Sequence, residues 1–538
     1  MRKFILFALM SISFLAACRE QGPEIHSINP RIGRMGDILV ILGRGFGEER
    51  NQSYVSIAGT PPVSSSYLSW NDAEIIVRVP DFGDSGLVFV HIGNNRSNPA
   101  LFSNQSIMPA TILQAEGNGP RITSIEPVSG PIGTLLTIRG SNFGVSRKDS
   151  GVFFPWESES QQSFSDLPYQ AYVEVSEAEF GYEFWSEREI RIRVPSGAVS
   201  GNLELRTPRG NSRPVLFEIT GKPGTKTYRD RRNYTFSVML DIDIETAFSP
   251  NTLYVWMPQP SPSSYQRNIR LLSRTPEPFI DNHYGTSIFQ FIDVSSGTKH
   301  GIIMSFSADV YALETDIRNQ AAVRLNRPSP IAERYTLAST LIPSNNPEII
   351  ARARQIVGNE RFPYGQAQRI YNWLLSSGGI LTSPFQGDLF DALEENRADN
   401  YSAALLFCAL ARSLDIPAIP VEGVLINRQR QTNRHFWAEF WLDGMGWVPV
   451  DPALGAGAAP PNFTLREDHE QFYFGNMDNQ RLTFSRGERF LAQMAPQGRS
   501  VVSSRDNSLQ NLWIEVAGGL QLYSYVWDDV TITGLYVQ

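Results

Sequence analysis

Cysteine is almost absent from this chain, and its scarcity limits the chemistry that the protein can carry. Only Cys18 and Cys408 occur among 538 residues, so one disulfide is the most that could form. The six histidines are scattered, and neither a C-x-x-C nor an H-E-x-x-H motif is present. The sequence therefore predicts no metal site, and we expect no cofactor.

Concentrated positive charge is also missing. Lysine and arginine number 47 against 55 acidic residues, which gives a formal net charge of −8, and no block of basic residues occurs. Nucleic-acid binding needs a basic face that neutralises phosphates, so we do not expect a nucleic-acid partner.

Long apolar runs are absent except at the start. Arg2 and Lys3 precede an apolar run from Phe4 to Leu15, which is typical of a secretory signal peptide over residues 1–17 and is too short to span a bilayer. Without this leader the net charge becomes −10. The residues Leu15-Ala16-Ala17-Cys18 resemble a bacterial lipobox. That resemblance implies export, a lipidated Cys18, a linker at 18–22 and a membrane anchor in the cell envelope, periplasmic or surface-facing. The alternative is an ordinary leader whose cysteine is incidental.

Two stretches near the N-terminus are copies of one unit. Ile25–Gly47 recurs as Ile122–Gly144 at a constant offset of 97, and later residues recur at an offset of 115, so the second copy is about 18 residues longer. Short alternating apolar runs between Gly, Pro and Asn turns predict a β-sandwich in each copy. The repeated motifs resemble the IPT/TIG immunoglobulin-like domain, with boundaries at 23–113 and 119–220. The fold alone does not assign a function to such modules.

The extra residues of the second copy lie between 145 and 184 and are rich in aromatic and acidic side chains. One interpretation is an exposed contact surface, because aromatic residues anchor many interfaces. The other is a set of extra strands that cover their own sandwich. The sequence favours the second interpretation and gives no ligand for the first.

The rest of the chain divides by its periodicity. Apolar–polar alternation predicts a further β-sandwich-like domain at 227–333, and helical spacing begins near residue 334. Helices are predicted at 347–358, 366–377 and 388–395, within a core that we place at 334–487. The β-rich tail at 488–538 is expected to add strands to that core or to the preceding β domain.

The most informative stretch runs from Glu395 to Gly455. A helix of small and apolar residues, 401–414, is followed by two predicted strands, of which the first carries His435 and the second leads into Asp451. His435-Phe436-Trp437-Ala438-Glu439 resembles the H-x-W-x-E strand of the transglutaminase-like branch of the papain-like fold. The segment from Gly446 and Trp447 to Asp451-Pro452 resembles the G-W-x-x-x-D-P strand of the same family. The fold class is therefore multidomain: two immunoglobulin-like sandwiches, a further β domain and an α+β transglutaminase-like core.

The resemblance implies a thiol mechanism, which needs a cysteine at a helix N-terminus, a histidine and an aspartate. His435 and Asp451 match the last two roles, with Trp437, Glu439 and Trp447 in support. Counting back from Ile416-Pro417, Asn400 stands where the family has its cysteine. Asparagine is a very poor nucleophile and a good helix N-cap, so capping is its simplest role. Cys408 lies eight residues further, about 12 Å along a helix, and is expected to be a buried apolar residue.

Three functions remain open. The leading hypothesis is an envelope lipoprotein whose transglutaminase-like domain is a pseudoenzyme that binds a peptide or protein, with the repeats as spacers or adhesive modules. The second is an active thiol peptidase or amide-transfer enzyme that acts on envelope proteins or peptidoglycan peptides. The third is an adhesin or scaffold that acts through the repeats. Whether the chain is an enzyme stays uncertain, and the missing nucleophile argues against it.

Overall fold

The computed structural model covers the whole chain and describes residues 22–33, 35–80, 86–93, 95–104, 119–148, 150–156, 172–176, 179–283, 285–322, 329–376, 389–395, 397–488, 494–495, 498–501, 513–527 and 530–537. The chain divides into two compact units, Met1–Glu116 and Gly117–Gln538. The signal peptide, Cys18 and the residues just after it lie outside the described ranges.

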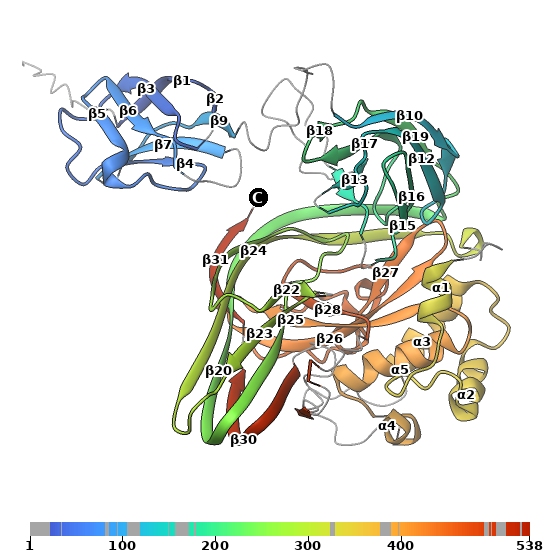
Figure 1. Ribbon diagram of the computed structural model, residues 1–538. Coiled ribbons are helices and arrows are strands. Elements are labelled where there is room, and N and C mark those ends of the chain that lie inside the picture. Colours follow the sequence, from blue (N-terminus) through green and yellow to red (C-terminus); the bar gives the residue numbers. More distant parts are fainter. Residues whose placement is uncertain are drawn as a thin grey trace, which may run out of the picture. The chain divides into compact units, whose positions relative to one another are not determined.

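The first unit is the first repeat, a sandwich of two sheets (Figure 1). One sheet has the order β1-β3-β6-β5, and the other has the order β2-β9-β7-β4, with β8 paired to β7. The strands are β1 (Glu24–Asn29), β2 (Ile32–Gly33), β3 (Ile38–Arg44), β4 (Tyr54–Ile57), β5 (Tyr67–Trp70), β6 (Glu74–Arg78), β7 (Gly86–Ile92), β8 (Asn95–Arg96) and β9 (Ala100–Asn104). Alternate residues of these strands fill the core between the sheets.

The second repeat has the same two sheets, with orders β10-β12-β16-β15 and β11-β19-β17-β13-β14. Its strands are β10 (Arg121–Glu126), β11 (Ser129–Gly130), β12 (Leu135–Ser141), β13 (Gly151–Pro155), β14 (Tyr172–Glu174), β15 (Tyr182–Trp185), β16 (Glu189–Arg193), β17 (Gly201–Thr207), β18 (Gly210–Asn211) and β19 (Val215–Ile219). The additional strand β14 pairs with the edge strand β13, so part of the 145–184 insertion does extend its own sandwich. Residues 157–171 of that insertion lie outside the described ranges.

Two kinds of repeated glycine follow from this duplication. Gly36 and Gly133 have φ values of +86° and +81°. Residues with a side chain rarely adopt such a backbone conformation, so glycine is favoured at both positions. Gly43 and Gly140 are needed for a different reason. A Cβ on Gly43 would lie 2.1 Å from the Glu24 carbonyl oxygen, and one on Gly140 would lie 1.9 Å from that of Arg121.

The third β domain is one continuous eight-stranded sheet and not two separate sheets. Its long strand β20 pairs with β24 and β23 and also with β30 and β31, so the C-terminal tail joins this domain and not the core. The core's own sheet covers its inner face and shares its apolar cluster. The strands are β20 (Gly224–Pro258), β21 (Gln266–Thr275), β22 (Ile280–His283), β23 (Thr286–Ile292), β24 (Lys299–Ile317), β29 (Arg499–Val501), β30 (Trp513–Trp527) and β31 (Thr531–Val537).

The core packs helices against a four-stranded antiparallel sheet of order β27-β26-β25-β28. Three strands, not the two expected, lie between α5 and Asp451, because Ala418–Ile426 forms β25 before the His435 strand. The elements are α1 (Pro330–Tyr335), α2 (Pro347–Val357), α3 (Pro363–Ser376), α4 (Leu389–Glu395), α5 (Asn400–Arg412), β25, β26 (Thr432–Leu442), β27 (Gly446–Val450), α6 (Pro452–Gly455), α7 (His469–Phe472) and β28 (Arg481–Arg486). The predicted helices at 347–358, 366–377 and 388–395 therefore correspond to α2, α3 and α4.

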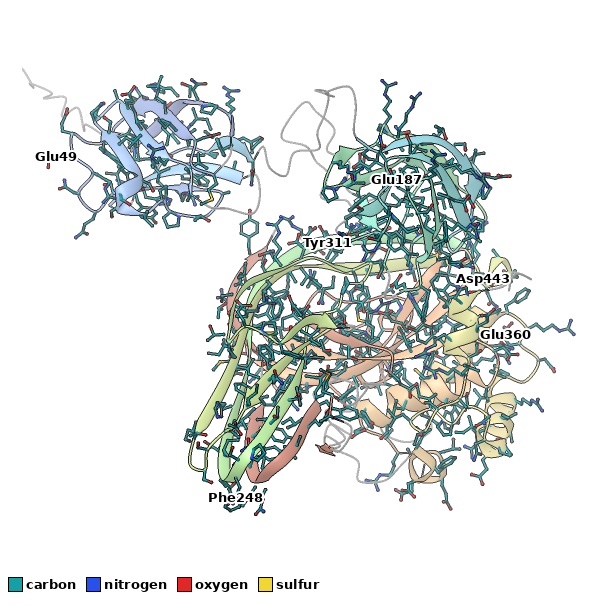
Figure 2. The ribbon with its side chains drawn as sticks, viewed as in Figure 1. Glu49, Glu187, Phe248, Tyr311, Glu360 and Asp443 are labelled. Carbon is teal, nitrogen blue, oxygen red and sulfur yellow. The ribbon has the colours of Figure 1, made fainter. Side chains whose placement is uncertain are left out.

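The second repeat is packed onto the third β domain and the core. Trp156 lies against Tyr228 and Tyr311, with ring centroids 4.8 and 5.0 Å apart. Tyr311, on β24, is labelled in Figure 2 at this boundary. The turn between β26 and β27 approaches so closely that a Cβ on Gly446 would lie 2.4 Å from the hydroxyl of Ser196. The second repeat is thus an integral part of the larger unit.

Candidate functional site

The N-terminus of α5 positions the first residue of the site. The N-cap is Asp399, whose carboxylate Oδ1 accepts a hydrogen bond from the Ser402 backbone N–H at 2.8 Å. Asn400 is the first helical residue, so the expectation that Asn400 caps the helix is wrong. The amide of Asn400 is available for another role because Asp399 already satisfies the helix end.

That role is a hydrogen bond to the histidine of the neighbouring strand. Asn400 Nδ2 lies 3.2 Å from Nδ1 of His435, which is 2% exposed and stands near the middle of β26. With its Nδ2 toward the ring, the amide donates and His435 Nδ1 accepts, which assigns the proton of the neutral ring to Nε2. The helix start and the strand thus bring together two residues that are 35 positions apart.

Asp451 completes the arrangement from the end of β27. Its Oδ2 lies 2.8 Å from His435 Nε2, and its Oδ1 accepts from the backbone N–H of Leu454 at 3.0 Å, so it also caps α6. Full burial raises the pKa of this carboxyl, but His435 and Arg481 outweigh burial and hold the pKa below its ordinary value. The carboxylate is therefore ionised, and its hydrogen bond fixes the orientation of the ring.

Arg481 of β28 is a site residue that the sequence analysis missed. It has no exposed surface, and it contacts Asp451 Oδ2 at 3.1 Å and Asp478 Oδ2 at 2.6 Å. Its guanidinium lies 4.8 Å from the ring centroid of Trp437. The only sequence signal for this residue is the spacing of Asp478 and Arg481, and that spacing is weak evidence for an ion pair. Nothing in the sequence indicates that β28 lies beside Asp451.

Glu439 of the H-x-W-x-E segment is fully buried, and its contacts lead away from His435. Its carboxylate accepts from the Tyr265 hydroxyl at 2.6 Å and pairs with Arg486 at 2.5 Å. Arg486 also binds Glu179 of the second repeat at 2.6 Å. Burial lowers the pKa of Arg486, but the two carboxylates outweigh burial and raise it above its ordinary value. Glu439 thus supports the site by fastening the core to the second repeat.

Trp437 and Trp447 are also supporting residues. Trp437 is fully buried, and its ring lies 6.2 Å from that of His435 in a stacked orientation. The indole Nε1 of Trp437 donates to the hydroxyl of Tyr265 at 3.3 Å. The carbonyl of Trp447 accepts from Lys226 Nζ at 2.6 Å, and burial lowers the pKa of that lysine to about 8. Both tryptophans therefore hold the histidine strand in place without offering a reactive group.

Cys408 is not positioned for catalysis. The side chain is fully buried among apolar residues of the α5 core. Burial raises the pKa of its thiol well above the ordinary value, so a thiolate is disfavoured at neutral pH. The expectation of a buried Cys408 agrees with the structure.

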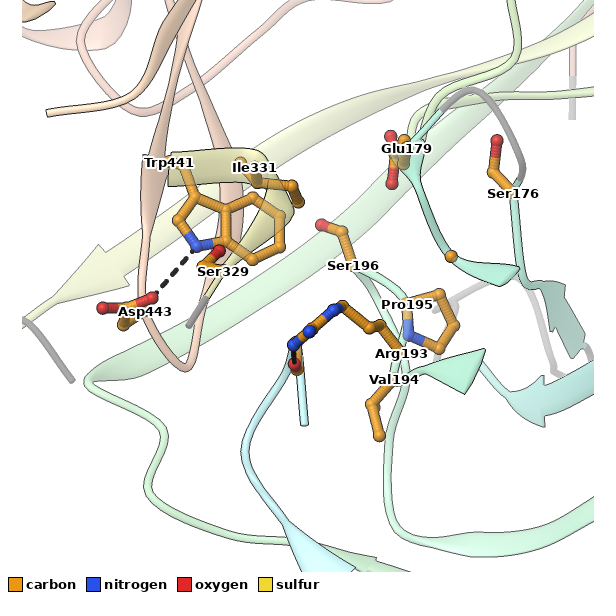
Figure 3. A pocket seen from close by; sticks show the side chains of 12 residues that line it. Ser176, Glu179, Arg193, Val194, Pro195, Ser196, Ser329, Ile331, Trp441 and Asp443 are labelled. Carbon is orange, nitrogen blue, oxygen red and sulfur yellow. Dashed lines mark hydrogen bonds between the residues drawn. The ribbon is translucent and has the colours of Figure 1, made fainter. Parts of the chain in front are cut away.

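A surface pocket lies at the boundary between the second repeat and the core (Figure 3). Glu179, Arg193 and Ser196 contribute from the repeat, and Trp441 and Asp443 contribute from the core. In Figure 3 the indole of Trp441 donates to Asp443, a hydrogen bond of 3.2 Å. None of the residues that line this pocket is Asn400, His435 or Asp451, so the pocket is separate from these three residues.

The described ranges show neither a metal-binding cluster nor a membrane-spanning helix. Within them, no group of three or more His, Cys, Asp or Glu side chains could hold a metal ion. Nor is any helix in the described part of the chain long and apolar enough to cross a bilayer. The proposed lipidation at Cys18 falls outside those ranges and remains a prediction.

Two family models match the chain. The transglutaminase-like superfamily model matches residues 350–452, a range that includes Asn400, His435 and Asp451. The IPT/TIG domain model matches residues 23–106 and 120–219. Among curated proteins, cyclomaltodextrin glucanotransferase of Paenibacillus macerans is 30% identical over 91 residues, which is 17% of this chain. The match spans only 12% of that relative's length.

Solved structures give weaker likenesses. A provisionally assigned cysteine protease from Cytophaga hutchinsonii is 15% identical, with a TM-score of 0.38 over 58% of this chain and 92% of the other. SGBP-B of Bacteroides uniformis is 11% identical, with a TM-score of 0.14 over 55% of this chain and all of the other. These TM-scores are low, and the domains are identified by the two family models. The chain is a multidomain, mostly β protein that contains two IPT/TIG domains and a transglutaminase-like domain.

Proposed function

We propose that this protein is a binding protein whose transglutaminase-like domain is a pseudoenzyme. The observation that carries the proposal is the hydrogen bond from Asn400 Nδ2 to His435 Nδ1. An activated thiol mechanism needs a nucleophile that gives its proton to this nitrogen. Here the nitrogen faces an amide, which has no readily ionised proton and does not attack a carbonyl. The ligand that we propose is a peptide or protein segment, the class of molecule on which the family's thiol enzymes act.

The first test is alkylation of thiols by iodoacetamide as a function of pH, in a chain without residues 1–18 so that Cys408 is its only thiol. We expect no reaction of the folded protein and full reaction after denaturant is added, because Cys408 is buried. Fast alkylation of the folded protein with a midpoint well below ~8.5, the free-thiol value, would contradict the proposal.

The second test restores the nucleophile with Asn400→Cys in a Cys408→Ala background. The new thiol would face His435 Nδ1 at the start of α5, where the helix dipole and the imidazole both favour a thiolate. We expect fast alkylation with a midpoint below ~8.5, which returns toward that value when His435→Gln is added. An Asn400→Cys variant that is folded but unreactive would mean that the site has no access for ligands.

The alternative function is a working thiol peptidase or amide-transfer enzyme. The observation that favours it is the intact His435–Asp451 pair at 2.8 Å. It requires a nucleophile from elsewhere, and Cys408 does not supply one. If the wild-type protein hydrolyses or transfers an amide and His435→Ala abolishes that activity, the enzyme proposal is correct and the pseudoenzyme proposal is wrong.

Anchoring in the cell envelope is part of the proposal and is supported by the Leu15–Cys18 segment. Lipidated Cys18 would hold the binding domains at a membrane. We expect the full chain made in a bacterium to partition into detergent and the Cys18→Ser variant to partition into water. Equal partition of the two proteins would remove the anchor from the proposal.

A further inference from the structure

The polarity of the Asn400 amide is tied to the protonation state of His435. Asn400 Nδ2 carries two N–H groups and no acceptor, so the contact at 3.2 Å requires an unprotonated His435 Nδ1. The other ring nitrogen donates to the ionised carboxylate of Asp451 at 2.8 Å. Both contacts fit a neutral ring with its proton on Nε2, and neither fits the other neutral tautomer.

A second proton on the ring must go to Nδ1, which would then point an N–H at the N–H of Asn400. His435 is 2% exposed and Asp451 holds its Nε2, so neither water nor rotation of the ring relieves this opposition. The amide relieves it without moving the backbone. A half-turn about the Cβ–Cγ bond exchanges two atoms of nearly equal size and brings Oδ1, an acceptor, to the ring.

Charged groups at the end of β27 and on β28 lie beside the ring. Asp451 at the end of β27 favours the protonated ring, and Arg481 of β28 and the N-terminus of α5 oppose it. Further from the ring, Asp478 pairs with Arg481, Tyr473 donates to Asp478, and Asp399 accepts from the Ser402 N–H. Tyr371 of α3 lies near Asp451. Opposite charges therefore lie on different elements around the ring.

We propose that the Asn400 amide is a pH-dependent polarity switch, which reverses when His435 is protonated and so changes the atom that the site offers to a bound peptide. With the neutral ring, the half-buried amide directs its carbonyl oxygen away from His435 and accepts from the ligand. With the protonated ring, it directs its NH₂ group there and donates. A peptide N–H fits the first state and a peptide carbonyl fits the second. This inference rests on the proposed binding function and adds its regulation.

The test is a pH titration by NMR of the full chain, with ¹⁵N-labelled histidine and asparagine. Histidine ring ¹⁵N shifts distinguish the two neutral tautomers and the charged ring. His469 is an internal control, because its Nδ1 faces the carbonyl oxygen of Gly455 at 2.8 Å and must carry a proton. Signals of the two rings are assigned with His435→Gln and His469→Gln, and the amide signal is assigned with Asn400→Ser.

We expect neutral His435 to carry its proton on Nε2, the opposite of His469. The side-chain NH₂ signal of Asn400 should then shift with the same midpoint as the His435 ring. A proton on Nδ1 of neutral His435 would overturn the inference, as would an Asn400 signal that ignores the titration of the ring.

The Asn400→Asp variant gives a second measurement. Its carboxylate accepts but cannot donate, so it should keep the ring protonated to a pH about 1 to 3 units higher than in wild type. An unchanged midpoint in the folded variant would contradict the contact on which the switch depends. Because these spectra need neither a ligand nor a reactive thiol, their failure is distinguishable from failure of the pseudoenzyme proposal.

Discussion

Arg481 is fully buried, carries a permanent charge and contacts two carboxylates, Asp451 and Asp478. Burying these three groups is costly unless each is paired, and the geometry pairs all of them. The ring of His435 depends on the same arrangement because Asp451 shares one oxygen between the ring and the guanidinium. At the residue scale, the charged side chain of Arg481 therefore stabilises the site, although Arg481 lies outside the sequence motif of His435 and Asp451.

Replacing Arg481 by methionine tests this support. We expect Arg481→Met to lower the free energy of unfolding by about 3–5 kcal/mol at pH 7, because it leaves two carboxylates buried without their partner. Urea denaturation gives the measurement. The matched control is Arg466→Met, which removes an exposed ion pair with Asp468 and should cost no more than about 1 kcal/mol. Similar losses for the two variants would contradict the support assigned to Arg481.

The same comparison has a pH dependence of known sign. The pKa of Asp451 is lowered in the folded state, so its stabilisation is present above the ordinary carboxyl value of 3.8 and is lost as the pH falls through the lowered value. Protonated carboxyls no longer need Arg481. The difference in stability between wild type and Arg481→Met should therefore shrink as the pH falls from 7 toward 3, and a constant difference would contradict the pairing.

At the element scale, two adjacent side chains at the start of α5 have different roles. Asp399 satisfies the helix end, and Asn400 reaches the histidine on β26. Both residues have short hydrogen-bonding side chains that suit a helix N-cap. The sequence analysis therefore predicted Asn400 as the cap, whereas Asp399 is the cap in the structure. Only the position of β26 decides which of the two faces His435.

The cap can be tested with two substitutions at one position. Asp399→Ala should lower stability by about 1 kcal/mol, because an N–H at the start of α5 loses its acceptor. Asp399→Asn should keep most of the stability, since asparagine caps helices about as well as aspartate. The midpoints of thermal unfolding report both. If the asparagine variant loses as much as the alanine variant, the charge and not the cap is what matters.

For the whole molecule, the two IPT/TIG domains differ in their relation to the rest. The first forms a compact unit of its own, whereas the second belongs to the larger unit. The second domain contributes Trp156 to an aromatic cluster and Glu179 to a partly buried ion pair with Arg486. Two copies of one sequence pattern therefore serve as an independent module and as a fixed part of the transglutaminase-like unit.

Deleting each domain separately tests this difference. Removal of residues 22–104 should leave the melting temperature of the remaining chain unchanged within about 1 °C, because the larger unit keeps its contacts. Removal of residues 120–219 should lower it strongly and promote aggregation, because Tyr228, Tyr311 and Trp447 lose their cover. Differential scanning calorimetry gives both results. Equal effects of the two deletions would contradict the conclusion that only the second domain is a fixed part of the larger unit. The first deletion is also the better test of adhesion through the repeats, because it should leave the rest of the chain folded.

Much of this protein is determined by local sequence. The repeats, their turn glycines, the helices α2 to α4 and the His435 and Asp451 strands are all readable from periodicity and motifs, because each depends on neighbours along the chain. Tertiary structure alone decided three features: the burial of Arg481 beside Asp451, the joining of the C-terminal strands to β20, and the contact between Asn400 and His435. Each of these depends on which distant segments pack together, and buried ion pairs and strand order leave little trace in local residue patterns.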